Sequence, residues 1–484
     1  MTPDPVGWTF DNSYARLPAD LHAPAKPMAV RAPKVVVLNH TLADQLGLNL
    51  HAYSPETAAA VFAGQELPPG SQPIAQAYAG HQFGGFTMLG DGRAVLLGEH
   101  RTPSGQLVDV QFKGPGPTPF SRRGDGRAAL GPMLREYVIS EAMAALGIPT
   151  TRSLAVVLTG EQVYRSQVQR GAVLTRIAAS HLRVGTFQYA AARQDETLLR
   201  TLADYAIARH YPALGELPNK YLAFFRAVAE RQAALVARWM HVGFIHGVMN
   251  TDNVSIAGET IDYGPCAFMN AYDPATVFSS IDTAGRYSYA NQPGITQWNL
   301  ARFAESLLTL LDADEEKAVA SAMEVLNEFP ATYQRHWLAG MRLKLGLRTE
   351  ESGDEQLAND LLGWMHAAKA DFTNTFRDLA NPELLAGELY QAGAFKAWHG
   401  RWTERLAREG DPTADVFARM NAVNPAYIPR NHRVEESLAA AERDDLAPLN
   451  ELLEVLASPF DARPEWAKYT MPGDDVGYRT FCGT

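Results

Sequence analysis

The feature that most constrains the fold is a change of hydrophobic pattern near Arg183. After this residue, apolar positions follow helical spacing over long segments, at 198–210, 221–242, 297–311, 315–326, 356–374 and 434–443. Before it, glycines are interspersed with short apolar runs typical of strands, at 94–97, 107–112, 153–158 and 172–177, with one helical pattern at 132–146. Strands followed by helices predict an α+β fold with two lobes and a cleft between them.

The length of 484 residues exceeds one ordinary core and predicts several structural units. We expect a proline-rich, extended wrapping segment over 1–70 and a β-rich lobe over 71–185. A helical lobe is expected over 186–375, and a helical extension with a loose tail over 376–484.

Composition narrows the class of protein. Hydrophobic residues make up 46% of the chain and charged residues 20%, as in folded soluble proteins. The formal net charge of −11 disfavours nucleic acid as a partner, because phosphate backbones bind basic surfaces. Two cysteines exclude a disulfide scaffold and a cysteine-based zinc cluster. No apolar run reaches the roughly 18 residues of a membrane span and no secretory signal is evident, so we expect a cytoplasmic protein without a membrane partner.

The most informative stretch begins at His246 and ends with an Asp-Tyr-Gly triplet at 262–264. We expect a β-hairpin over 253–261 that presents Asn253 and Asp262 from its two ends. Amide and carboxylate oxygens are hard ligands that suit Mg²⁺, which completes its shell with water and phosphate oxygens. Asn and Asp also fill turns, so a turn role for Asn253 stays open.

Kinase-like folds use a loop of the form His-x-Asp-x-x-x-x-Asn followed by Asp-x-Gly. Counting from His246, Asn253 falls on the asparagine and Asp262 on the metal-binding aspartate. Val248 stands where the catalytic aspartate belongs, so the usual base is missing from its position. Asp252 is the nearby carboxylate that can take the proton of an attacking hydroxyl, and we prefer it as the base. The alternative is that Asp252 only caps a turn.

Lys113 follows an apolar strand and precedes glycines, the placement of the strand lysine that pairs with nucleotide phosphates in kinases. Its expected partner is a glutamate of the predicted helix at 132–146. Glu136 and Glu141 both qualify, but they face different sides of a helix, so only one can pair with Lys113. A single lysine is often just a surface residue, and that alternative stays open.

Glycine-rich turns flank this strand, at 80–85, 90–93 and 124–127. Glycines let backbone N–H groups approach a phosphate closely, although a lone Gly-x-Gly is usually only a hairpin turn. Between residues 111 and 135, Asp125 is the only acidic residue, and the basic residues are Lys113, Arg122, Arg123, Arg127 and Arg135. Such a local excess of cations in an acidic chain favours a polyanion site.

Arg176 and Arg183 flank the junction of the two predicted lobes. Two guanidinium groups at this junction can clamp a terminal phosphate through paired hydrogen bonds. A pair of salt bridges between the lobes is the alternative.

With these residues taken together, the chain resembles the selenoprotein O family, whose members are protein adenylyltransferases with a pseudokinase fold. The resemblance spans nearly the whole chain and rests on the segments 12–17, 77–84, 89–93, 180–188, 246–253, 262–265 and 424–431. It implies a bilobal, protein-kinase-like fold with extra N- and C-terminal segments. It also implies that ATP binds in a flipped orientation and that AMP is moved to a Ser, Thr or Tyr hydroxyl of a protein substrate, with release of pyrophosphate.

The resemblance implies roles for individual residues as well. Asp252 would be the base, and Asn253 and Asp262 would hold Mg²⁺ or Mn²⁺. The residues that would bind ATP are Gly90, Gly92, Arg93, Lys113, Asp125, Gly126, Glu136, Arg176 and Arg183. Two rival functions remain: a kinase that uses the same site, and an inactive pseudokinase scaffold that only binds nucleotide.

The resemblance also gives the two cysteines a role. Many eukaryotic members of the family carry selenocysteine close to the C-terminus, and Cys482 occupies a similar place here. Cys266 follows the Asp-Tyr-Gly triplet, where a kinase activation segment would begin. We expect the two cysteines to form a reversible disulfide that acts as a redox switch. Two unrelated thiols are the alternative.

Overall fold

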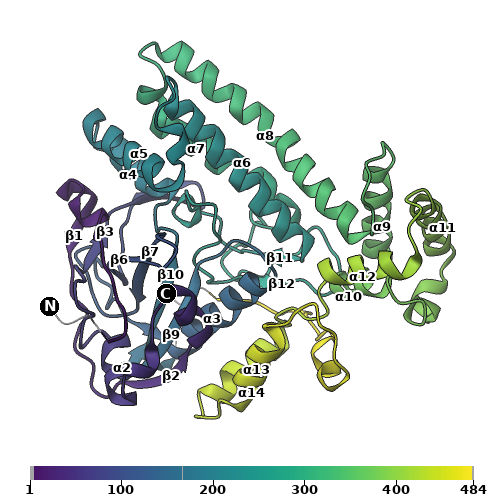
Figure 1. The fold of residues 1–484 in the computed structure, drawn as a ribbon, viewed down its shortest axis with the longest axis horizontal. Coiled ribbons are helices and arrows are strands. Elements are labelled where there is room, and N and C mark those ends of the chain that lie inside the picture. Colours follow the sequence, from purple (N-terminus) through teal and green to yellow (C-terminus); the bar gives the residue numbers. More distant parts are fainter. Residues whose placement is uncertain (1–4, 166, 482–484) are drawn as a thin grey trace.

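The computed structural model describes residues 5–165 and 167–481. It confirms an α+β fold, with a β-rich N-terminal region beside a helical C-terminal region (Figure 1). The four strand patterns predicted from the sequence all fall within strands of this structure. None of the helices in the described part of the chain is long and apolar enough to cross a membrane.

The main sheet has eight strands in the order β1-β3-β6-β7-β10-β9-β2, with β8 paired to β10. Their bounds are β1 His22–Pro24, β2 Lys34–Leu38, β3 Ile74–Gln76, β6 Ala94–Arg101, β7 Leu107–Lys113, β8 Ala128–Ala129, β9 Arg152–Tyr164 and β10 Val168–Ala178. Two small sheets pair β4 (Ala79–Gln82) with β5 (Gly85–Met88) and β11 (Phe244–Ile245) with β12 (Ala267–Phe268). β7 and β10 are antiparallel neighbours inside the main sheet and are mostly buried, so their side chains are held rigidly.

The proline-rich N-terminal segment supplies both edge strands of the main sheet, β1 and β2. Two helices follow β2: α1 (His40–Leu46) and α2 (Pro55–Phe62). The side chains of Asn39 and Ser54 accept hydrogen bonds from backbone N–H groups in the first turns of these helices. Apolar residues of both helices pack on one face of the sheet.

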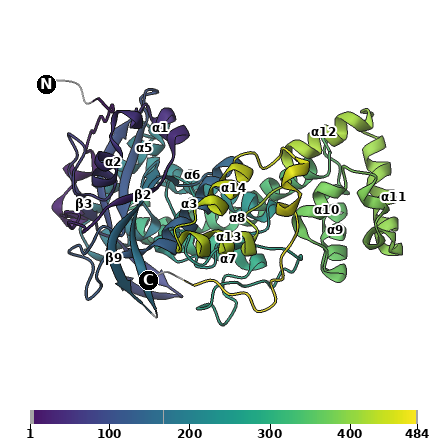
Figure 2. The same cartoon turned by 90° about the horizontal axis from the view of Figure 1, so that it is seen from below.

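Helix α3 (Leu130–Ala145) packs against strands β9 and β10 of the main sheet. It corresponds to the helix predicted at 132–146. Helices α13 (Asn431–Ala441) and α14 (Ala447–Leu456) return from the C-terminal region and pack against α3, as Figure 2 shows. As a result, 11 of the 16 residues of α3 are buried. Packing on both sides fixes the rotation of α3 and therefore the direction in which Glu136 points.

The helical region is built around α6 (Lys220–His241), α7 (Gln292–Leu311) and α8 (Glu315–Lys344), which pack against one another (Figure 1). Its other helices are α4 Val184–Ala192, α5 Glu196–His210, α9 Asp354–Ala368, α10 Phe372–Asp378, α11 Gly393–Ala407 and α12 Thr413–Val423. The ring of Phe303 in α7 contacts those of Phe187 in α4 and Phe224 in α6, so these three helices share one core.

Two predicted helices end at other residues than expected. The pattern at 315–326 extends to Lys344, because apolar residues beyond Pro330 remain buried against the rest of the helical region. The pattern at 356–374 is split into α9 and α10, because Lys369 adopts a left-handed conformation with φ 51° and ends α9.

The expected β-hairpin over 253–261 is wrong. Ser255 forms an isolated bridge with Arg183, and Thr260 forms one with Thr150, so the two sides of this segment do not pair with each other. The segment is an irregular loop that ties the helical region to the β-rich region.

Candidate active site

A cavity of about 540 Å³ opens between the β-rich and helical regions. Nine of the predicted site residues line it: Gly90, Gly92, Arg93, Lys113, Arg176, Arg183, Asp252, Asn253 and Asp262. Asp125 and Gly126 do not, but they line a neighbouring cavity of about 530 Å³ that shares two residues, Gly92 and Arg93, with the first. We call the first cavity the cleft and the second the outer cavity.

Lys113 stands at the end of β7, and its side chain is 6% exposed. Its Nζ donates hydrogen bonds to Glu136 Oε2 at 2.6 Å and to Asp262 Oδ1 at 2.9 Å. Glu141, the other candidate partner, instead pairs with Arg152 at 2.6 Å. The structure therefore brings Glu136, not Glu141, to Lys113.

Arg176 lies on β10, directly opposite Gln111 of β7. Its Nε donates a hydrogen bond to Gln111 Oε1, and its Nη1 donates to Glu136 Oε1 at 3.1 Å and to Asp262 Oδ1. The register of two central strands thus sets the place of this guanidinium. Gln111 was not predicted, although it lies two residues before Lys113 and therefore on the same face of β7.

Arg183 immediately precedes α4 and is 2% exposed. Its Nη1 donates hydrogen bonds to Asp262 Oδ2 at 3.3 Å and to the backbone oxygen of Asp252 at 2.9 Å. The guanidinium lies over the ring of Tyr78, 4.4 Å from the centroid. Burial raises the pKa of Tyr78 well above its ordinary value, so its hydroxyl stays protonated. Tyr78 lies in the segment 77–84, on which the family resemblance rests, but no role was predicted for it, because its role depends on this tertiary contact.

The carboxylate of Asp262 is the meeting point of three cations. Burial by itself raises the pKa of a carboxyl group, but the charges of Lys113, Arg176 and Arg183 outweigh it and hold the pKa of Asp262 well below its ordinary value. Salt bridges join these three cations to two carboxylates, those of Asp262 and Glu136, and the charges of Asp91 and Asp252 also act on Arg183. A phosphate group could compete with the Asp262 carboxylate for the three cations through charge-assisted hydrogen bonds.

Asp252 lies in a 3₁₀ turn (Thr251–Asn253) beside these cations and is 8% exposed. Burial raises its pKa to about 6. Its Oδ1 is buried and has no hydrogen-bond partner among the described residues. Gly80 makes room for this oxygen, since a Cβ atom at Gly80 would lie 2.2 Å from it. Val248, at the usual position of the kinase base, is apolar and lines the cleft.

Asn253 and Asp262 both line the cleft and carry oxygen atoms of the kind that bind a divalent cation. The Nδ2 of Asn253 donates a hydrogen bond to the backbone oxygen of Val248 at 2.9 Å, so its amide oxygen is the atom left for a ligand. Residues 5–165 and 167–481 contain no cluster of three or more His, Cys, Asp or Glu side chains that could hold a metal. A cation held by one amide oxygen and one carboxylate would therefore draw its remaining ligands from water and a bound polyphosphate.

Asp91 and Asn250 also line the cleft and were not predicted. Asp91 accepts a hydrogen bond from the backbone N–H of Gln76 at 3.0 Å, and burial raises its pKa to about 6. The sequence feature that could have identified Asp91 was its position between two glycines, Gly90 and Gly92. Asn250 accepts a hydrogen bond from the hydroxyl of Tyr287 at 2.8 Å, a contact that sequence spacing does not reveal.

Cys266 is a free cysteine with no exposed surface, and burial raises the pKa of its thiol to about 12. The structure does not support the predicted disulfide with Cys482, which lies outside the described residues. A thiol that is sealed in the core and protonated at neutral pH is a poor partner for disulfide exchange. The redox-switch interpretation therefore has no structural support.

Known proteins match this chain over nearly its whole length. A family model described as "Protein adenylyltransferase SelO" matches residues 6–457. A protein from Geobacillus kaustophilus named protein nucleotidyltransferase YdiU is 60% identical over 99% of this chain and 100% of its own length. Relatives with the same name from Syntrophotalea carbinolica and Anoxybacillus flavithermus are both 58% identical over 99% of this chain, and the matches cover 98% and 100% of their lengths.

The cationic cleft and these matches together define an enzyme of the nucleotidyltransferase class. More specifically, the chain belongs to the SelO family. The family assignment made from the sequence motifs is thereby confirmed.

Proposed function

We propose that the protein is an adenylyltransferase that moves AMP from ATP to a Ser, Thr or Tyr hydroxyl of another protein and releases pyrophosphate. The observation that carries this proposal is the charge at the inner end of the cleft. Lys113, Arg176 and Arg183 are each 5% exposed or less. Buried cations of this kind suit the terminal phosphates of ATP, whereas an uncharged base would offer them no charge-assisted hydrogen bonds.

The outer cavity supports the orientation of ATP. It is lined by Asp125 and Gly126, and it joins the cleft at Gly92 and Arg93. Asp125 is exposed, so this cavity lies toward solvent. A nucleotide with its terminal phosphates at the inner cations can extend its sugar and base past Gly92 into the outer cavity. This orientation is the reverse of that in ordinary kinases, and it exposes the α-phosphate to an acceptor.

We also infer a protein-kinase-like arrangement of the two regions. A strand lysine paired with a helix glutamate, here Lys113 and Glu136, is a part that kinases share. The pair of Asn253 and Asp262 on the opposite wall corresponds to their metal ligands. An apolar residue such as Val248 at the position of the kinase base is compatible with a site in which the α-phosphorus reacts instead of the γ-phosphorus.

The transfer begins with attack of the acceptor hydroxyl on the α-phosphorus. A bond forms between the hydroxyl oxygen and the α-phosphorus. The bond between the α-phosphorus and the oxygen that bridges the α- and β-phosphates breaks, and its electron pair leaves with pyrophosphate. Asp252 accepts the hydroxyl proton, because its Oδ1 is unpartnered among the described residues and its pKa of about 6 leaves it ionised at neutral pH. Arg183 connects the two halves of the site, since it bonds both Asp262 and the backbone of Asp252.

Asn253 and Asp262 would hold Mg²⁺ or Mn²⁺, which lowers the negative charge of the phosphates when bound. In the structure, however, the Asp262 carboxylate is engaged by Lys113, Arg176 and Arg183. A triphosphate that takes over these cations would release Asp262 for the metal. Glu136 would keep Lys113 and Arg176 in place during this exchange.

Transfer of label from ATP tests the proposed function. The protein is incubated with Mg²⁺ and a library of peptides that carry Ser, Thr or Tyr, in parallel with ATP labelled at the α- or at the γ-phosphorus. We expect α label on the peptides and pyrophosphate in solution. Label from the γ position alone would identify a kinase, and ATP binding without any transfer would favour the scaffold.

A further inference from the structure

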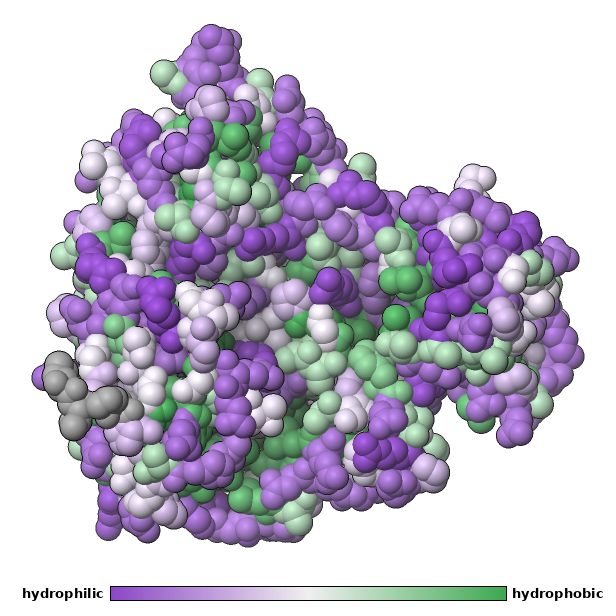
Figure 3. Space-filling view, in the orientation of Figure 1, coloured by the Kyte–Doolittle hydropathy of each residue, from purple (hydrophilic) through white to green (hydrophobic). Residues whose placement is uncertain are grey.

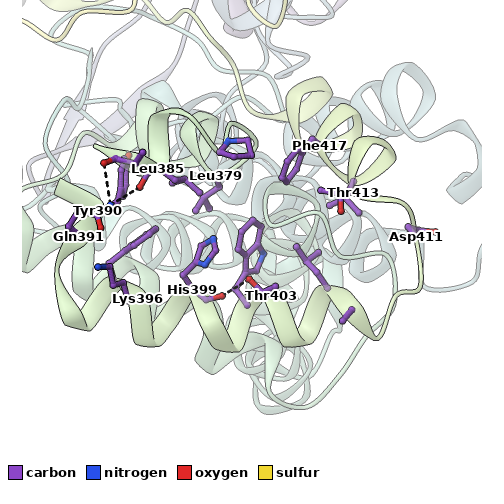
Figure 4. Close-up of a pocket in the computed structure, with 17 residues that line it drawn as sticks. Leu379, Leu385, Tyr390, Gln391, Lys396, His399, Thr403, Asp411, Thr413 and Phe417 are labelled. Atoms are coloured by element: carbon purple, nitrogen blue, oxygen red, sulfur yellow. Dashed lines mark hydrogen bonds between the residues drawn. The ribbon is translucent and has the colours of Figure 1, made fainter. Parts of the chain in front are cut away.

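A pocket of about 560 Å³ lies in the helical region, and none of its lining residues lines the cleft. Its walls come from α11, α12 and the segment between α10 and α11 (Figure 4). The volume is within the range of small-molecule sites in proteins. The proposed nucleotidyl transfer does not use this pocket, which we call the α11 pocket.

The walls of the α11 pocket are mainly apolar. Phe395 and Trp402 are each 2% exposed, and Leu379, Leu385 and Phe417 lie across from α11 in Figure 4. The polar atoms of its aromatic walls have partners: the Trp402 indole N–H donates to the backbone oxygen of Leu345 at 2.9 Å, and the hydroxyl of Tyr390 donates to Asp378 at 2.6 Å. The walls therefore favour an aliphatic or aromatic ligand body.

Two nitrogen-bearing side chains of α11 line one part of this pocket, Lys396 and His399. They are three residues apart and so lie on the same face of the helix. Lys396 is exposed, and its ammonium group has no ion-pair partner within the described part of the chain. The His399 ring contacts the rings of Phe395 and Trp402, with centroids 5.7 and 5.2 Å apart. This part of the pocket offers one uncompensated cation and one imidazole to an anionic group.

The single carboxylate among the described lining residues is Asp411, which Figure 4 shows at the opposite end from Lys396. Arg348 and Arg419 pair with its two oxygens at 2.8 and 2.7 Å. Its charge is therefore compensated, and it does not oppose an anion bound near Lys396. The α11 pocket as a whole is an apolar slot with positive charge at one end.

From this complementarity we infer that the α11 pocket binds an aliphatic monocarboxylate, with the chain along Phe395 and Trp402 and the carboxylate beside Lys396 and His399. A fatty acid of medium length has this chemistry. The inference goes beyond the proposed transfer reaction and is independent of it, because the two sites share no lining residue.

Calorimetric titration of the full chain with three probes of equal chain length tests this inference. The probes are dodecanoate, dodecanol and dodecylammonium, each kept below the concentration at which it forms micelles. We expect dodecanoate to bind at one site and dodecylammonium to bind at least about tenfold more weakly, because the ammonium head would face Lys396. ATP should not displace dodecanoate, since it would occupy the distant cleft.

A charge reversal supplies the decisive variant. Lys396→Glu changes an exposed side chain, so the fold should be retained, and it should make dodecylammonium the tighter ligand. Lys317→Glu, at an exposed lysine of α8, is the matched control and should keep the preference for dodecanoate. Equal binding of the three probes, no binding of dodecanoate, displacement by ATP, or an unchanged preference in Lys396→Glu would each overturn the inference.

Discussion

The ammonium group of Lys113 lies 2.9 Å from Asp262 Oδ1, so the proposed metal ligand neutralises one of the proposed phosphate ligands. Arg176 and Arg183 contact the same carboxylate. Asp262 therefore stands where a terminal phosphate would make its contacts. On this view, the nucleotide and the Asp262 carboxylate compete for the same three cations.

Replacement of Asp262 should have opposite effects on binding and on transfer. Asp262→Asn should strengthen the binding of metal-free ATP by about tenfold, or ~1.4 kcal/mol, because the three cations lose an internal counter-charge. Transfer in the presence of Mg²⁺ should be lost with the metal ligand. Calorimetry in the presence of a chelator measures the first effect, with the exposed Asp444→Asn as a control. Unchanged or weaker metal-free binding would contradict the competition.

The two glutamates of α3 offer a matched pair of variants. Glu136→Gln should lower kcat/KM for ATP by at least about tenfold, because Lys113 and Arg176 lose the charge that positions them. Glu141→Gln carries the same chemical change on the same helix, but it contacts Arg152, so kcat/KM should stay within about twofold of wild type. Steady-state kinetics compares them. Similar losses in both variants would mean that the effect comes from α3 as a whole.

The space beside Asp252 can be filled by one methyl group. In Gly80→Ala the added Cβ would lie 2.2 Å from Asp252 Oδ1, so the carboxylate must move and transfer should fall by at least about tenfold while ATP binding is retained. Gly85→Ala, on the neighbouring strand, is the control, since its nearest atom would lie at 3.5 Å. Wild-type transfer by Gly80→Ala would argue against Asp252 as the base.

The stability of the fold should depend on the ionisation of His181. Burial lowers its pKa to about 4, although Asp109 Oδ2 accepts hydrogen bonds from both the main-chain N–H and the ring Nδ1 of His181. In the unfolded chain a histidine has a pKa of about 6.5. Between these values the unfolded chain binds more protons, so the free energy of unfolding should fall as the pH falls from 6.5 to 4, by up to about 3 kcal/mol for this group.

Urea titrations over this pH range measure the effect. His181→Asn removes the titrating ring, and its free energy of unfolding should decline less steeply than that of the wild type. Equal slopes for the two proteins would show that His181 does not titrate as expected.

Spacing along one segment identified much of the candidate site. Asn253 and Asp262 were predicted from a single loop, and both line the cleft. The sequence left Glu136 and Glu141 as alternatives, because the choice depends on the rotation of α3. That rotation is set by packing against α13 and α14, some 300 residues further along the chain.

Other features depended on contacts that no local pattern records. The register of β7 and β10 places Gln111 against Arg176, and Tyr78 comes to lie under Arg183 only in the folded chain. The loop at 253–261 resembles a hairpin in sequence, but its bridges run to Arg183 and to a residue before β9. The sequence could therefore predict the α+β organisation and the charge of the site, but not the way its walls are assembled.

A crystal structure of the protein with Mg²⁺ and a non-hydrolysable ATP analogue tests the central claim most directly. We predict that the γ-phosphate lies within hydrogen-bond distance of Lys113, Arg176 and Arg183, and that the base lies in the outer cavity near Gly126. A base lodged among the three cations, with the γ-phosphate directed toward solvent, would contradict the proposed adenylyl transfer.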